Sequence, residues 1–313
     1  MEKSKLDQFF SHPVASVLLA MTVNMLWGCA FPFIKVGYEL FSIDTTNVSS
    51  IFVFAGTRFT TSGLIVLIGA SMIRRKALLL PLKKSSLKVV GVGLLQTSFQ
   101  YAMYYSAVAL LAGKVGSLLN TSGSFFAVII AHFLYGDKDR LTKHKVLGCL
   151  VGFLGVTLAC SSPDNGFTMM GAMLMVISTL ALAFSGPANK AVCKEFDGFL
   201  VTGYNLTIGG LVLLSLGLVT GGSITVMSPL AYLDLAALCF ISCVGFTLNA
   251  FLMKNNPVSR IGIFGMCIPI TTNIICAIMF PESYSFGGTD FIAILLVCLG
   301  IYFVNKPKKE VTV

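Results

Sequence analysis

Long apolar stretches separated by short polar segments make up most of the 313-residue chain. A helix needs about 20 predominantly apolar residues to cross a bilayer core of about 30 Å. By that measure we predict ten membrane-spanning helices. They fall at about residues 14–36, 51–72, 89–111, 115–135, 146–161, 169–190, 198–220, 230–252, 259–280 and 288–305. The segments between them are short and leave no room for a separate soluble domain.

Composition supports a membrane protein and narrows the functions that remain. Hydrophobic residues make up 56% of the chain and charged residues 11%, whereas an average soluble chain is about one quarter charged. The mean hydropathy of +0.87 points the same way. These values argue against a cytosolic enzyme, a disordered chain and a disulfide-rich secreted module. The nine cysteines include no C-x-x-C pair and no cluster with metal-ligand spacing, so we expect no metal and no cofactor.

The positive charges predict how the chain crosses the membrane. The formal net charge is +9, and all of the 22 Lys and Arg except Lys35, Arg58 and Lys114 fall on one side of the predicted bundle. Lys and Arg collect in cytoplasmic loops of membrane proteins. We therefore predict a multi-pass protein of the cytoplasmic membrane with both termini in the cytoplasm. The basic excess is explained by topology, so we expect no nucleic-acid partner.

The ten predicted spans divide into two sets of five, which we treat as repeats over residues 1–163 and 164–313. A weak match supports the division: Pro32-x-x-Lys35 near the end of the first span has a counterpart in Pro187-x-x-Lys190 near the end of the sixth. An odd number of spans places the second repeat upside down. Inverted repeats are common in transporters, with the substrate site near the midplane. We predict an all-α integral membrane fold of ten transmembrane helices in two inverted five-helix repeats.

Arg58 is the strongest single candidate for a functional residue. It lies about seven residues inside the second predicted span, where a charge costs roughly 2.5–3.5 kcal/mol on insertion scales. Such a residue should face the interior of the bundle or a wet cavity. It could orient a substrate carboxylate or another anion. The alternatives are snorkelling to the outer interface and a structural bond to carbonyl groups.

Neutral polar and aromatic side chains form a second group of candidates. Gln96, Gln100 and Tyr104 recur every four residues in the third span, so they share one helix face that should turn inward. This stripe is either a pore lining or a set of interhelical hydrogen bonds. The first span contributes Asn24 and Trp27, the only tryptophan, which either contacts substrate or fills the core.

The second half of the chain offers weaker pointers. Asn249 lies in the eighth span and Asn273 in the ninth, where Pro269 should interrupt the helix and free a carbonyl. His132 is the only histidine within a predicted span, so it is a candidate for proton coupling, with a structural role as the alternative. All thirteen acidic residues lie in tails, in loops or near span ends. Their placement argues against a permanently cationic substrate and against simple carboxylate-based proton exchange.

These residues resemble a known family. The segments Trp27-Gly28-x-x-Phe31-x-x-x-Lys35 and Phe54-Ala55-x-x-Arg58-Phe59 are similar to the first two spans of the drug/metabolite transporter superfamily, EamA type. The stretch from Gly171 to Lys190 resembles the start of that family's second repeat, and Pro269 with Glu282 resembles its Pro…Glu pattern at the ninth span. The resemblance implies a ten-helix inverted-repeat permease with a central cavity, often one that exports amino acids or related metabolites.

We therefore expect a secondary transporter that exports small metabolites, such as neutral or aromatic amino acids, by alternating access around a central cavity. The chain has no P-loop, so ATP does not drive it directly. The expected partners are a small-molecule substrate and the lipid bilayer, and Gly148-x-x-x-Gly152 is weak evidence for a homodimer. The alternatives are a membrane channel or sensor and, less favoured, an intramembrane enzyme. The expected substrate-binding residues are Asn24, Trp27, Arg58, Gln96, Gln100, Tyr104, Asn249 and Asn273.

Overall fold

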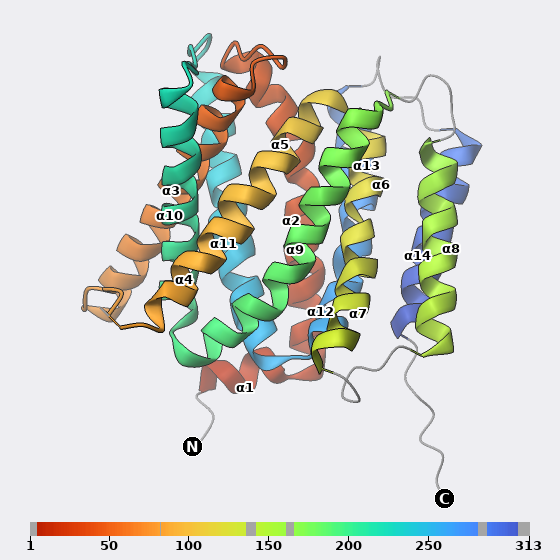
Figure 1. Ribbon diagram of the computed structural model, residues 1–313, viewed down its shortest axis with the longest axis horizontal. Helices are drawn as coiled ribbons and strands as arrows, with labels where there is room; N and C mark the ends of the chain where they lie inside the picture. The colour runs from red at the N-terminus through yellow and green to blue at the C-terminus, as the bar shows by residue number, and fades with distance from the viewer. Residues whose placement is uncertain (1–4, 82, 136–141, 161–165, 281–286, 306–313) are drawn as a thin grey trace, which may run out of the picture.

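The computed structural model describes residues 5–81, 83–135, 142–160, 166–280 and 287–305, and every regular element in these ranges is a helix. The helices are α1 (Lys5–Ser11), α2 (Pro13–Leu40), α3 (Val48–Arg74), α4 (Ser86–Val92), η1 (Gly93–Phe99), α5 (Gln100–Leu110), α6 (Gly113–Asn120), α7 (Ser122–Tyr135), α8 (Lys143–Cys160), α9 (Met169–Glu195), α10 (Gly198–Val219), α11 (Leu230–Asn255), α12 (Val258–Gly262), η3 (Ile263–Met266), α13 (Cys267–Met279) and α14 (Gly288–Asn305). Most run roughly parallel or antiparallel along one axis (Figure 1). The predicted all-α class is confirmed for this part of the chain.

Among the described residues, six helical segments are long and apolar enough to cross a membrane. They are Pro13–Leu40, Val48–Arg74, Val115–Leu134, Met169–Glu195, Gly198–Val219 and Leu230–Asn255. Large apolar side chains on their outer faces are exposed, for example Leu211 and Leu216 on α10. An apolar surface of this kind suits contact with lipid rather than water. The chain is therefore a multi-pass membrane protein.

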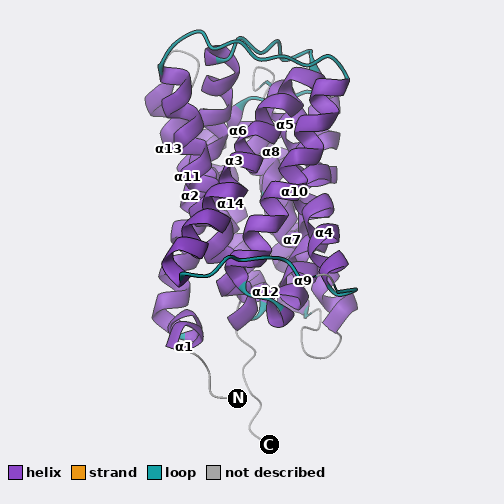
Figure 2. Cartoon of the chain, turned by 90° about the vertical axis from the view of Figure 1, so that its left-hand side faces the viewer, coloured by secondary structure: helices purple, strands orange, loops and turns teal. Residues whose placement is uncertain are grey.

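Helix α1 and the C-terminal end of α14 lie at the same end of the bundle (Figures 1 and 2). We call this the terminal end and the opposite end the distal end. The link between α2 and α3 and the link between α10 and α11 both lie at the distal end. Two backbone hydrogen bonds join these links, from Thr225 N to Phe41 O at 3.1 Å and from Met227 N to Leu40 O at 3.0 Å.

Three interruptions of regular α-helix fall within the predicted spans 89–111, 115–135 and 259–280. The segment from Ser86 to Leu110 contains the π-helical stretch η1, which sits between α4 and α5. Thr121 separates α6 from α7. The 3₁₀ segment η3 separates α12 from α13 and comes just before Pro269, which occupies the first turn of α13. Proline is tolerated in a first turn because no backbone donor is lost there.

The Gly148-x-x-x-Gly152 motif packs within the chain. A Cβ atom at Gly300 of α14 would lie 2.5 Å from the carbonyl oxygen of Gly148 and 2.6 Å from the nitrogen of Gly152 on α8. Such a close approach of two backbones requires small residues on both helices. The motif is therefore a contact between α8 and α14 within one chain, and the homodimer stays a prediction.

Candidate functional site

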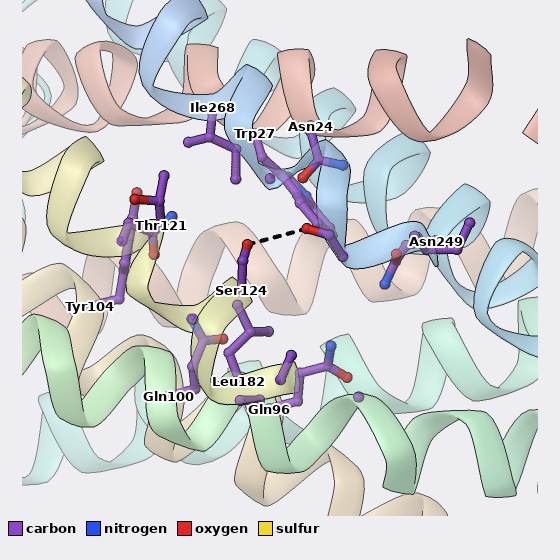
Figure 3. A pocket seen from close by; sticks show the side chains of 18 of the residues that line it. Asn24, Trp27, Gln96, Gln100, Tyr104, Thr121, Ser124, Leu182, Asn249 and Ile268 are labelled. Atoms are coloured by element: carbon purple, nitrogen blue, oxygen red, sulfur yellow. Dashed lines mark hydrogen bonds between the residues drawn. The ribbon is translucent and has the colours of Figure 1, made fainter. Parts of the chain in front are cut away.

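A cavity of about 140 Å³ lies inside the bundle. One buried water needs about 10–15 Å³ on the same measure, so the cavity holds about ten waters or one small metabolite. Seven of the predicted binding residues line it: Asn24, Trp27, Arg58, Gln96, Gln100, Tyr104 and Asn249. In Figure 3, Asn24 and Trp27 lie on one side of the cavity and Gln96 and Gln100 on the other. Residues far apart in the sequence therefore meet around one space, as a substrate site between two halves would require.

The helix interruptions supply part of the cavity wall. Thr121 and Ser124 contribute from the break between α6 and α7, and Gly262 contributes from the end of α12. Ser124 Oγ donates a hydrogen bond to Gly262 O at 3.2 Å, which joins two interruptions across the cavity (Figure 3). Non-helical backbone within a membrane is tolerated where it is buried in protein or lines a cavity. The breaks are therefore consistent with a functional cavity rather than with irregular packing.

Trp27 and Gln100 each present a polar atom with no partner in the structure. Trp27 Nε1 and Gln100 Oε1 are buried and lack a hydrogen bond to any described residue. The Trp27 ring meets the Phe246 ring edge-on at 5.9 Å, and Gln100 Nε2 donates to Ser178 Oγ at 3.3 Å. A buried donor or acceptor without a partner costs about 1–3 kcal/mol. Both residues line the cavity, but each unpaired atom is itself closed off, and a Cβ at Gly245 would lie 2.7 Å from Trp27 Nε1.

Arg58 is buried, with a relative exposure of 2%, and does not reach the bundle surface. Its Nε donates to Leu238 O at 3.2 Å and to Ser242 Oγ at 3.0 Å, and its Nη1 donates to Tyr105 Oη at 2.7 Å. Its guanidinium carbon lies 5.0 Å from the centroid of the Phe59 ring. The snorkelling interpretation is wrong, because the side chain is held inside by these bonds. No ion pair to Arg58 is present among the described residues, so its charge is available to an anion in the cavity.

Gln96 takes part in both roles that the sequence left open. It lines the cavity, and its Oε1 accepts hydrogen bonds from Asn205 Nδ2 at 2.8 Å and Asn189 Nδ2 at 3.2 Å. Asn205 Oδ1 also accepts from Thr97 Oγ1 at 2.7 Å. The network joins η1 to α9 and α10. Sequence reasoning missed Asn189 and Asn205, because a single amide within an apolar span does not indicate which helix it faces.

Two predicted residues lie elsewhere. Asn273 is buried in α13, with a relative exposure of 2%, and is not among the residues that line the cavity. His132 is half-buried in the last turn of α7 and also lies outside the cavity lining, with its ring 5.4 Å from that of Phe133. The cavity geometry therefore gives neither residue a place in substrate contact.

One acidic residue is more deeply placed than the sequence indicated. Asp234 lies one turn into α11 and has a relative exposure of 6%. Neither of its carboxylate oxygens has a hydrogen-bond partner among the described residues. A position near a span end was the only sequence signal, and it indicated solvent contact. Burial arises because Gly37 of α2 lets the carboxyl group approach closely: a Cβ there would lie 2.9 Å from Asp234 Oδ2.

Comparison with known proteins identifies the class of protein that this fold and cavity represent. Residues 14–161 and 169–306 each match the EamA-like transporter family. The chain is 24% identical over 304 residues to an "Uncharacterized transporter" of Archaeoglobus fulgidus, covering 93% of this chain and 99% of that protein. It is 22% identical over 298 residues to a "Probable amino-acid metabolite efflux pump" of Escherichia coli strain K12, covering 91% and 93%. A crystal structure superposes with a TM-score of 0.67 at 19% identity over 91% of this chain and 96% of that one.

The chain therefore belongs to the EamA-like transporter family, and the predicted family membership is confirmed. Family membership and the apolar helices together define a multi-pass membrane transporter, not an enzyme. The crystal structure supports the fold alone, because the sequence identity is low.

Proposed function

We propose that this protein is a secondary transporter that exports small metabolites bearing a carboxylate, with neutral or aromatic amino acids as the first candidates. The observation that carries the proposal is a cavity lined by Trp27, Gln100 and Arg58, a buried cation with no ion-pair partner among the described residues. A similar protein is named a "Probable amino-acid metabolite efflux pump". That name supports the substrate class and the direction for this chain.

The cavity's chemistry matches the groups of a zwitterionic amino acid. Arg58 can bind the carboxylate through charge-assisted hydrogen bonds. Gln100 offers a neutral polar side chain to the ammonium group, and the rings of Trp27, Tyr104 and Phe246 offer an apolar wall to a side chain. The described residues that line the cavity include no Asp or Glu, which disfavours a permanently cationic substrate. Aromatic walls bind apolar and aromatic groups through large contact areas.

In alternating access, the cavity would open first to one side of the membrane and then to the other. Its lining reaches Met253 and Val258, near the terminal end, whereas Arg58, Tyr105 and Tyr38 fill the bundle toward the distal end. Two inverted five-helix repeats over residues 1–163 and 164–313 would supply the moving halves. In this proposal the termini are cytoplasmic, the membrane is the cytoplasmic membrane, and the described state opens toward the cytoplasm.

Efflux from loaded proteoliposomes tests the proposal. Liposomes containing the protein would be preloaded with an equimolar mixture of neutral, aromatic, acidic and basic amino acids, and mass spectrometry would record what leaves. We expect saturable loss of a few neutral or aromatic amino acids, compared with empty liposomes. Folded protein that releases none of them, or releases them without saturation, would remove the amino-acid assignment and favour a different metabolite or a channel.

A further inference from the structure

The structure contains a buried acid whose surroundings are arranged for a neutral carboxyl group. Asp234 has a relative exposure of 6%, and neither of its carboxylate oxygens has a hydrogen bond to a described residue. Its Oδ2 lies over Gly37, and Phe54 contacts the same position. An ionised carboxylate without donors in apolar surroundings costs several kcal/mol, and a bound proton removes most of that cost.

The cation that acts on Asp234 is Arg58, whose hydrogen bonds go to other residues. Arg58 on α3 and Tyr105 on α5 are close enough to interact electrostatically with Asp234, but neither is hydrogen-bonded to it. Arg58 instead donates to Leu238 O and Ser242 Oγ, which lie four and eight residues after Asp234 on the same face of α11. Tyr38 of α2 flanks the site and donates its hydroxyl to Tyr105 O at 2.9 Å. These bonds keep Arg58 from neutralising Asp234 directly.

At the distal end, hydrogen bonds join the link between α10 and α11 to the region where α2 ends and α3 begins. The link between α10 and α11, residues 220–229, leads directly into the turn that carries Asp234. Thr225 N and Met227 N of this link donate to Phe41 O and Leu40 O, and Ser223 N donates to Ser50 Oγ at 3.1 Å. We call residues 220–229 the distal cap. Ile224 of the cap packs against the apolar cluster that contains Tyr38 and Phe54, so separation of the cap from the α2–α3 link would loosen the packing around the carboxyl group.

We propose that Asp234 is a proton-binding site and that closing the distal cap takes up one proton on its carboxyl group. In the closed state the acid is protonated. When the cap opens, water hydrates the carboxylate, and the proton leaves to the solvent on the distal side. Opening is therefore favoured as the pH rises. Proton binding is independent of the substrate, whereas its use in driving transport rests on the proposed function.

Hydrogen–deuterium exchange of the cap amides tests this linkage with protons as the only ligand. In the full-length protein in lipid, the amides of Thr225 and Met227 report cap opening after correction for intrinsic exchange rates. If opening releases one proton, the protection of these amides should fall about tenfold for each unit by which the pH rises. This slope applies where Asp234 is protonated in the closed state and ionised in the open state. Asp234→Asn keeps the shape but cannot ionise, so its protection should not change with pH.

A matched control uses the exposed acid at the same end. Asp44 Oδ1 accepts from Thr46 N at 2.9 Å and Thr46 Oγ1 at 2.8 Å, and Asp44→Asn should keep the wild-type pH dependence of cap protection. Infrared spectra should also show a protonated-carboxyl band in wild type that Asp234→Asn lacks. The proposal is overturned if wild-type protection is independent of pH, or if Asp234→Asn shows the same slope. A failure of amino-acid efflux, with the slope intact, would remove the proposed substrate and leave the proton site standing.

Discussion

Replacing Arg58 tests whether its charge recognises substrate. Arg58→Gln removes a buried cation that donates to Leu238 O, Ser242 Oγ and Tyr105 Oη. Three hydrogen bonds to a charged group are worth roughly 1.5–3 kcal/mol each. Relief of the burial cost of the charge returns roughly 2.5–3.5 kcal/mol. The net destabilisation is then roughly 1–6.5 kcal/mol, so a lower yield of folded protein is expected.

The effect on substrate should exceed the effect on folding. Removing one partner of a buried, hydrogen-bonded charge pair costs about 2–5 kcal/mol of binding. At about 1.4 kcal/mol per factor of ten, carboxylate substrates should bind about 30-fold to about 4,000-fold more weakly to Arg58→Gln. Arg58→Lys keeps the charge and loses the planar fork, so it should retain a larger part of the affinity.

The assay compares a transported amino acid with its carboxamide in proteoliposome counterflow. The ratio of the two rates is independent of how much protein is folded. Wild type should prefer the carboxylate strongly, Arg58→Gln should lose that preference, and Lys76→Gln removes an equal charge from an exposed position and should change nothing. An unchanged preference in folded Arg58→Gln would show that Arg58 does not recognise the carboxylate and has a structural role instead.

Two further substitutions test packing and the amide network, by thermal unfolding of the purified protein in detergent. Gly300→Leu should destabilise the contact between α14 and α8 by roughly 1–3 kcal/mol, because the new side chain meets the α8 backbone. The control Gly288→Leu places its side chain in open space and should be neutral. Equal stabilities of the two variants would contradict this packing of α14 on α8. Asn205→Leu should cost roughly 1–3 kcal/mol, because Gln96 Oε1 loses its 2.8 Å donor and Thr97 Oγ1 its acceptor; an unchanged unfolding temperature would mean that the network contributes little.

The all-α class and the six long apolar helices were predictable because hydrophobic length is a local property of the sequence. The stripe of Gln96, Gln100 and Tyr104 could also be predicted, because helical spacing alone places these residues on one face. The π-helical stretch η1 gave no such signal, since no proline or glycine pair marks the change of hydrogen bonding. It depends on the helices packed around it.

Properties that depend on pairs of distant residues were hidden. The burial of Asp234 depends on Gly37, which is 197 positions earlier and gives the carboxyl group room to approach α2. The bonds that hold Arg58 inside come from α5 and α11, so the sequence could not decide between snorkelling and internal bonding. The packing of Gly148 and Gly152 against Gly300 likewise required the pairing of α8 with α14.

The central claim is that substrate passes through the cavity, and filling the cavity tests it most directly. Leu182 of α9 lines the cavity, whereas Leu180, two residues earlier, is exposed on the outer surface with a relative exposure of 39%. Initial efflux rates would be measured for Leu182→Trp and Leu180→Trp at equal amounts of folded protein in liposomes. We expect about a 5-fold to 140-fold loss for Leu182→Trp, because added side-chain volume occupies the substrate's space at a cost of about 1–3 kcal/mol, and a near-normal rate for Leu180→Trp. A normal rate for Leu182→Trp would show that substrate does not pass through this cavity and would place the transport path elsewhere.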